Sequence, residues 1–463
     1  MAAVGNGVGK WVAAALLAAA VPAQAENLLH QALGAPDNLI ISGLFRSRFE
    51  GIQGQFRPEP IEASGAMVSL RFVLFAEYDT GPVRIGAEFN DSRAYLEGDR
   101  SSVSNAEVNV FNLTQAYLGF DLDDALGEGT TSTLSVGRIT MDFGSRRLIG
   151  RNLFRNTVNT FTGARFDWHG AGTAAGADVA TLFWTMPVTR LPRDPRRVAD
   201  NEFEVDAQGL NTQFFGAGYT KAGVLGGTAQ LYTLALLEND ATDLETLDRH
   251  LLTTGLRFFR PPGRSRFDHD VEVVYQFGTR GSLIRDNAPR QDVSAWFFHL
   301  ESGYTFAAAW SPRVVLQLDY ATGDRDDPNS FNGFDTLFGV RRGEFGPASL
   351  YGPLGRTNII SPALRLEAAP SPRWDGFLVW RPLWLESATA VFSFTGVRDP
   401  TGSAGSWAGH QIEGRVRYWL VPDLIRLDGG MAYLAKSDFF RLAANGRDDG
   451  NTRYGYLDIS FLF

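Results

Sequence analysis

Arginine side chains gather in one short segment of the chain, and such a gathering suits the recognition of anions. Arg146, Arg147, Arg151 and Arg155 lie within ten positions, and Asp142 is the only acidic residue between positions 142 and 160. A guanidinium group is planar and can hold a carboxylate through two parallel hydrogen bonds, whereas an ammonium group acts as a point charge. The segment therefore predicts contacts with carboxylate-bearing solutes.

Further charged residues are expected to join this segment in one conduit. Arg138 precedes it, Arg165 follows it, and Asp167 shares a strand face with Arg165. A second set stands on the polar faces of predicted strands: Arg46, Arg48, Arg71, Arg84, Arg365, Arg415 and Arg417. Two interpretations stay open, because the arginines either hand an anion along a channel or pair with nearby acids and brace the structure. We favour the conduit for the segment 142–160 and bracing for single arginines on strands.

The composition excludes several classes of protein. The chain has 463 residues, a formal net charge of -9 and no cysteine, and all but three of its 43 basic residues are arginine. Without cysteine there are no disulfides, thiolate metal sites or cysteine nucleophiles. A nucleic-acid-binding protein is normally strongly basic, so no nucleic-acid partner is expected.

Residues 1–25 have the features of a secretory signal peptide. Lys10 supplies the positive start, an apolar run extends from Trp11 to Val21, and the small residues Ala23 and Ala25 mark a cleavage site. The run is shorter than the roughly 20 residues that a helix needs to cross a bilayer. We expect an exported chain that starts with a short N-terminal periplasmic segment at 26–39.

The rest of the chain alternates between apolar and polar residues, as strands with two different faces do. Between positions 68 and 78 every even residue is apolar or aromatic, whereas Arg71 and Glu77 stand among the odd ones. The same period recurs at 271–277 and at 411–420. Helical periodicity is scarce, so the sequence predicts an all-β protein.

Strand length and loop length extend this prediction to a membrane barrel. Predicted strands often run about 10 to 14 residues, Trp and Tyr recur near their ends, and the last strand carries Phe461 and the terminal Phe463 on one face. Short turns tend to alternate with long loops such as 188–208 and 323–356. We predict a transmembrane antiparallel up-and-down β-barrel of about 18 strands over residues 40–463, integral to a Gram-negative outer membrane. A barrel of this size leaves an aqueous channel.

The segment 142–160 becomes the third long loop of this barrel. By analogy with many porins, we expect the loop to fold into the lumen, where its guanidinium groups would meet Arg138 and Arg165. Individually weak and numerous sites of this kind allow an anion to pass without being trapped.

Catalytic motifs are missing from the sequence. The six histidines stand in no H-E-x-x-H motif, and there is neither a G-x-S-x-G elbow nor a Walker loop. The acidic residues Asp324, Asp326 and Asp327 lack the order of an EF-hand loop. We expect neither enzyme activity nor a cofactor or metal site, and we expect the acidic loop to be solvated and bridged to lipopolysaccharide by divalent cations.

Two stretches of the sequence resemble the signature blocks of the alginate export family. The first comprises Gly137-Arg138, Phe143-Gly144-Ser145, Arg147-Leu148, Asn156-Thr157, Thr160-Phe161, Gly163 and Arg165. The second comprises Asp319-Tyr320-Ala321-Thr322-Gly323-Asp324, Phe334-Asp335, Leu337-Phe338 and Leu350-Tyr351-Gly352. The resemblance implies a monomeric outer-membrane barrel of 18 strands that secretes an acidic polysaccharide.

The sequence thus favours a passive, anion-selective channel for an alginate-like anionic polysaccharide, fed by diffusion or by a periplasmic synthesis complex. A porin that imports small organic anions is the alternative, and a structural or adhesive surface protein with a plugged lumen is a third class. Outer-membrane lipid and lipopolysaccharide are the expected surroundings.

Overall fold

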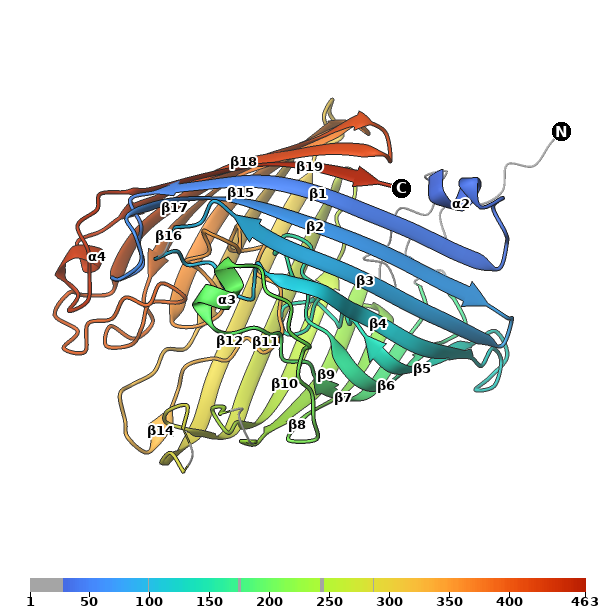
Figure 1. Cartoon of the computed structure of the whole chain (residues 1–463), viewed down its shortest axis with the longest axis horizontal. Coiled ribbons are helices and arrows are strands. Elements are labelled where there is room, and N and C mark those ends of the chain that lie inside the picture. Colours follow the sequence, from blue (N-terminus) through green and yellow to red (C-terminus); the bar gives the residue numbers. More distant parts are fainter. Residues whose placement is uncertain (1–27, 99, 174–175, 242–244, 286) are drawn as a thin grey trace.

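One sheet closes on itself to form the whole molecule (Figure 1). The computed structural model describes residues 28–463 apart from 99, 174–175, 242–244 and 286, so the predicted signal peptide lies outside the described residues. In the described chain, β1 pairs antiparallel with both β2 and β19, which closes the barrel. The short strand β14 lies in a loop and pairs parallel with β12, and the other eighteen strands form the antiparallel wall.

The wall strands follow one another in chain order, and the described residues also contain three short helices outside the sheet. The strands are β1 (Leu39–Gln53), β2 (Ser64–Asp79), β3 (Val83–Tyr95), β4 (Asn109–Asp121), β5 (Thr131–Ile139), β6 (Phe161–His169), β7 (Val179–Pro187), β8 (Thr212–Val224), β9 (Gly227–Glu238), β10 (His250–Arg260), β11 (Arg266–Gly281), β12 (Arg290–Thr305), β13 (Arg313–Ala321), β14 (Ser330–Phe331), β15 (Ile359–Ser371), β16 (Trp374–Trp384), β17 (Trp407–Val421), β18 (Ile425–Lys436) and β19 (Thr452–Leu462). The helices are α2 (Leu28–Ala32), α3 (Pro195–Ala199) and α4 (Phe439–Leu442). β1 begins one residue before the predicted start of the barrel.

Alternation along each strand decides which side chains face the lumen. In β1, Arg46, Arg48 and Glu50 are buried inside the barrel, whereas Phe45 and Phe49 are exposed on the outer face. An apolar outer band and a polar interior are the arrangement of a barrel that stands in lipid. Because each wall strand pairs with a neighbouring strand on both sides, closure leaves no free sheet edge.

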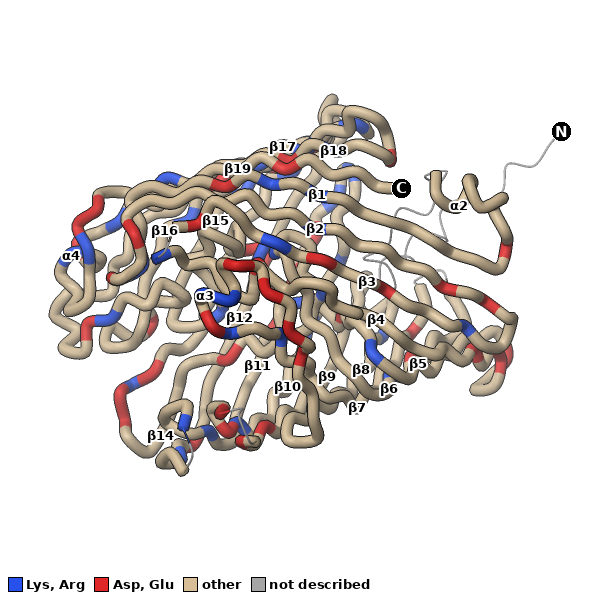
Figure 2. The backbone as a smooth tube through the Cα atoms, in the orientation of Figure 1, with Lys and Arg blue, Asp and Glu red and all other residues tan. Residues whose placement is uncertain are grey.

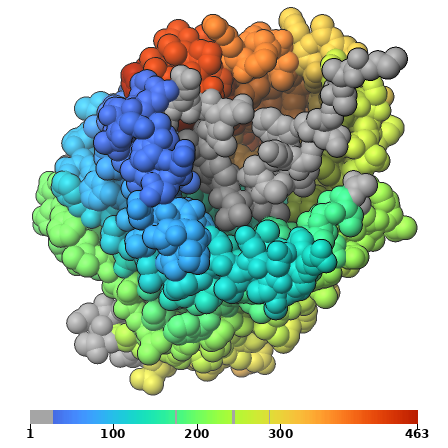
Figure 3. Space-filling model, turned by 90° about the vertical axis from the view of Figure 1, so that its right-hand side faces the viewer, coloured from blue at the N-terminus to red at the C-terminus, as the bar shows by residue number. Residues whose placement is uncertain are grey.

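The two ends of the barrel differ in their connections. At one end the strands are joined by short turns, and α2 and the C-terminus lie there (Figure 1). From that end the coloured part of the chain forms a ring (Figure 3). The opposite end carries the long loops, numbered L1 to L9 in chain order. Those used below are L1 (54–63), L2 (96–108), L3 (140–160), L4 (188–211) and L7 (322–358).

None of the helices in the described part of the chain is long and apolar enough to span a membrane.

Candidate functional site

L3 crosses the lumen and contacts walls that lie far apart round the barrel. Arg46 Nη1 and Arg48 Nη1, both of β1, donate to the carbonyl oxygens of Leu153 and Phe154 at 2.7 and 2.6 Å. Asn156 Nδ2 donates to the carbonyl oxygen of Leu70 on β2 at 3.0 Å. The loop is therefore held inside the barrel by inward-facing side chains rather than lying over its mouth.

L7 packs against L3 through the backbones of both loops. Phe338 N donates to Leu148 O at 2.9 Å, Val340 N donates to Arg146 O at 3.0 Å, and Ile149 bridges Phe338 in parallel. The ring of Phe338 stacks edge-on against Phe161 with 5.1 Å between the centroids. L3 and L7 together form a plug with its own apolar core, which narrows the space left for a solute.

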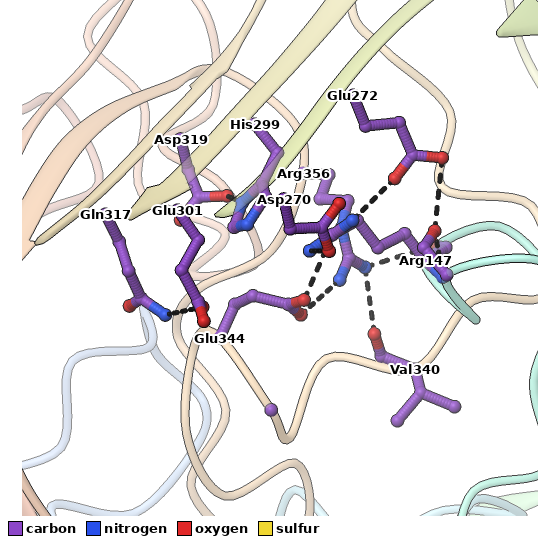
Figure 4. Close-up of polar contacts among 12 residues, drawn as sticks. Arg147, Asp270, Glu272, His299, Glu301, Gln317, Asp319, Val340, Glu344 and Arg356 are labelled. Carbon is purple, nitrogen blue, oxygen red and sulfur yellow. Dashed lines mark hydrogen bonds and ion pairs between the residues drawn. The ribbon is translucent and has the colours of Figure 1, made fainter. Parts of the chain in front are cut away.

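Arg147 is the polar centre of this plug (Figure 4). Its guanidinium group lies 2.9 Å from Asp270, 2.7 Å from Glu272 and 3.1 Å from Glu344, and the side chain is 5% exposed. Although burial disfavours its charge, Glu344, Asp270 and Glu272 raise the pKa of Arg147 above its ordinary value. All three guanidinium nitrogens of Arg147 donate to carboxylates. Arg147 therefore braces the plug, and no nitrogen is left to bind a solute.

The remaining L3 arginines have unequal surroundings. Arg146 Nε lies 2.9 Å from Asp142, and Arg151 Nη2 lies 2.7 Å from Glu88 on β3. Arg155, by contrast, donates to the carbonyl oxygen of Thr157 and to Asn159 Oδ1, which are neutral acceptors. Within the predicted cluster, only Arg155 lacks a carboxylate partner among the described residues.

The two strand residues that flank L3 point in opposite directions. Arg165 faces the lumen and holds Asp167 through two hydrogen bonds of 2.7 and 2.9 Å. Arg138 shares its strand face with the exposed Val136, so it lies on the outer surface, where it donates to Leu113 O and Gln208 Oε1. The expectation that Arg138 lines the conduit is wrong, because alternation along β5 turns it away from the lumen.

The strand arginines of the second set include a file along one wall. Arg365, Arg415 and Arg417 all point inward from β15 and β17, on the same face as the buried Phe377 of β16. The guanidinium carbons of Arg365 and Arg415 lie 3.9 and 4.8 Å from the centroid of that ring, and Arg342 of L7 lies 5.7 Å from it. We call Arg342, Arg365, Arg415 and Arg417 the arginine file. It extends from the short-turn end towards L7.

Acidic and basic residues both occur along the strands of the barrel (Figure 2), and the file has acidic partners. Arg365 pairs with Glu367 at 2.7 Å, and Arg342 pairs with Glu413. Arg415 and Arg417 share Asp375 at 3.2 and 3.0 Å. In the described chain, four guanidinium groups thus share three carboxylates within ion-pair distance, and Asp428 acts on Arg415 from farther away.

Several residues of the site escape detection in the sequence. Arg341 and Arg342 lie inside the second signature block, between Phe338 and Leu350, and Arg190 lies in the loop predicted at 188–208. An arginine count over the loops would have found them. The partners Asp270, Glu272 and Glu344 carry no local signal, because they meet Arg147 only when the barrel closes. The described residues contain no group of three or more His, Cys, Asp or Glu placed to hold a metal ion.

Comparison with known proteins identifies the architecture. The model of a family described as alginate export matches residues 38–452. The chain is similar to two solved Pseudomonas aeruginosa structures, the outer membrane protein opdK and OccK2 (OpdF) in complex with glucuronate, and to a BenF-like porin from Pseudomonas fluorescens Pf-5. Each of the three is 11% identical to this chain, and each alignment covers 92% of this chain. The alignments cover 99, 96 and 99% of the three solved chains, in the order given, with TM-scores of 0.54, 0.54 and 0.58. No curated protein matches the sequence.

Proposed function

Because the chain belongs to the alginate export family and is an integral outer-membrane channel, we propose that an acidic polysaccharide of the alginate type leaves the cell through its arginine-lined lumen. In this proposal a periplasmic synthesis complex or diffusion delivers the polymer at the short-turn end, and one barrel acts as a monomer. The long loops face the outside, as is usual in barrels of this kind.

The observation that carries the proposal is the arginine file. Its guanidinium groups follow one another along the wall, and each is already shared with a carboxylate or held over an aromatic ring. At Arg365, Arg415 and Arg417, whose ion pairs are partly exposed, an incoming uronate exchanges with the present partner at little cost, since an ion pair in contact with water contributes only about 0–1 kcal/mol. A row of weak sites lets a polyanion advance stepwise without being trapped.

A porin that imports small organic anions is the second candidate. The plug of L3 and L7 favours it, because the plug lies against the inner wall, where the half-buried Phe338 of L7 packs edge-on against the buried Phe161 of β6. The glucuronate complex of OccK2 (OpdF) also fits a small uronic acid as solute. Both candidates need the same positive wall and differ in the size of solute that passes.

Planar-bilayer conductance of the refolded protein tests the shared part of the proposal. We expect a reversal potential under a KCl gradient that indicates anion selectivity, and a concentration-dependent block by oligouronate. Arg365→Gln and Arg415→Gln should each lower the selectivity and weaken the block. Arg138→Gln removes the same charge from the outer face and should change neither quantity. A cation-selective pore that ignores uronates would contradict the proposal.

Solute size separates the two candidates. Proteoliposomes loaded with oligouronates of increasing length should release long chains if the protein exports a polymer. Release of monomers and dimers alone would instead favour the importing porin.

A further inference from the structure

A second group of arginines lies where L2, L3, L4 and L7 meet, away from the arginine file. Arg155 Nη2 of L3 and Arg190 Nη1 of L4 both donate to Asn159 Oδ1, at 2.7 and 2.8 Å. Asn159 Nδ2 donates to Phe338 O of L7 at 3.2 Å, which turns the amide oxygen towards the two arginines. We call Arg155, Arg190 and Asn159 the Asn159 cluster.

Two further arginines surround the cluster without adding a counter-charge. Arg341 of L7 donates to the carbonyl oxygens of Gly352 and Leu354 and covers the ring of Phe394. Arg57 of L1 donates to Leu350 O and Tyr351 O. Two acids lie nearby and bond elsewhere: Glu107, which is 4% exposed, accepts from Ser104, and Asp206 accepts from Leu191 N and Asn109 Nδ2.

Charges of one sign do not gather in a half-buried place without compensation. Burial, followed by repulsion from Arg190, lowers the pKa of Arg155, and burial with repulsion from Arg356 and Arg57 lowers the pKa of Arg341 to about 10. The four arginines nevertheless bond only to neutral oxygens of the described chain. The charges of Glu107 and Asp206 compensate the four arginines only in part. An anion from outside the protein would supply the remaining compensation.

Free donors remain for that anion. Arg190 uses Nε for Asn105 O and Nη1 for Val158 O and Asn159 Oδ1, and Arg155 uses Nε and Nη2. In the described structure, Nη1 of Arg155 and Nη2 of Arg190 therefore have no hydrogen-bond acceptor. Neither atom is among the fully buried polar atoms without a partner. Both stay within reach of water and of a solute.

We propose that the Asn159 cluster, with Arg341 and Arg57 beside it, is a fixed binding subsite for a single carboxylate group of the passing solute. The inference rests on the proposed function and deepens it by assigning the carboxylate-selective step to the long-loop end. The arginine file, whose members are shared with acids, would serve for transit instead. Two guanidinium groups converging on one neutral oxygen can close on a carboxylate without breaking an existing ion pair.

Calorimetric titration of the refolded full chain with glucuronate tests the subsite, with glucose as the uncharged probe. Arg155→Gln and Arg190→Gln should each weaken glucuronate binding roughly tenfold. Arg190→Lys keeps the charge but loses the fork and should fall between. Arg138→Gln is the matched control and should bind like the natural chain. Heat-modifiable migration on a gel verifies that each variant is folded.

The outcomes separate this subsite from the channel proposal. Unchanged affinity in both glutamine variants, or equal binding of glucose, overturns the subsite. An anion-selective pore that binds no glucuronate overturns the subsite while the channel proposal stands. A cation-selective pore that still loses glucuronate affinity in Arg190→Gln overturns the channel proposal and supports the subsite.

Discussion

Arg147 Nη1 lies 2.7 Å from Glu272 Oε2, and this ion pair joins residues 125 positions apart in the chain. Glu272 also accepts hydrogen bonds from Tyr232 and Ser145, while Asp270 is held by Arg257 as well. The pair thus fastens L3 to β11 inside a network in which acids and guanidinium groups compensate one another. The position of the plug depends on this network.

Removal of the Arg147 charge should loosen the plug. Arg147→Met keeps most of the volume but leaves Asp270, Glu272 and Glu344 without their common partner, and stranding buried charges in this way costs about 3–5 kcal/mol. We expect a lower midpoint of urea unfolding and a larger, noisier single-channel conductance. Arg146→Met is the control, because Arg146 is partly exposed and its pair with Asp142 contributes only about 0–1 kcal/mol. Equal effects of the two substitutions would contradict this role of Arg147.

Gly339 sets the distance between L3 and L7. A Cβ atom at this position would lie 1.8 Å from the carbonyl oxygen of Arg147, where no side chain fits. Gly339→Ala should therefore push L7 away from L3 and increase the frequency of open–closed transitions in bilayer recordings. Gly343→Ala is the control, since a Cβ atom there meets nothing within 4 Å. If both variants gate like the natural chain, the two loops do not move as one plug.

Most of the fold was predicted from the alternation of apolar and polar residues along single strands. The faces read from residues 68–78 are those of β2, where Arg71 and Glu77 are buried and the even residues point outward. Alternation also predicted that Arg365, Arg415 and Arg417 face the lumen. It failed at Arg138 only because the residue was grouped with the loop: Val136, two positions earlier on the same face, already indicates the outer surface.

Pairings across the lumen were beyond the sequence. That Arg147 meets three acids while Arg155 meets none depends on how L3 and L7 pack, and no periodicity encodes this. Whether a given arginine braces the structure or lines the conduit could therefore be judged only from its contacts in the structure. The structure supports bracing for Arg147, Arg151 and Arg165, whereas Arg155 bonds only to neutral acceptors of the described residues.

Neutralising Asp375 should have the opposite effect to removing an arginine. Asp375→Asn leaves Arg415 and Arg417 without their shared acid, which raises the positive charge of the lumen near the short-turn end. We expect the reversal potential to shift towards stronger anion selectivity. Asp438→Asn removes the same charge from an exposed pair with Arg441 next to α4 and should leave selectivity unchanged. A shift towards cations in Asp375→Asn would show that the file does not set selectivity.

Glu107 should make stability depend on pH in an unusual direction. Burial raises its pKa to about 7, with Glu50 opposing its charge and Ser104 and Arg155 favouring it. An unfolded glutamate titrates near 4.3, so between about pH 4.3 and 7 the folded chain holds one more proton than the unfolded chain. The stabilisation from this proton is complete below about pH 4.3 and is lost as the pH rises through 7.

Glu107→Gln should remove that dependence. The difference in the urea midpoint of unfolding between pH 5.5 and pH 8 that comes from Glu107 should be absent in the variant. At pH 8 the variant should be more stable than the natural chain.

The protonation state of Glu107 also affects the Asn159 cluster, because a charged Glu107 attracts Arg57, Arg155, Arg190 and Arg341. Glucuronate should therefore bind more weakly at pH 8 than at pH 6 in the natural chain and equally at both in Glu107→Gln. Glu62→Gln, at an exposed acid paired with Arg100, should keep the natural pH dependence. A slope that persists in Glu107→Gln would assign the titration to another group.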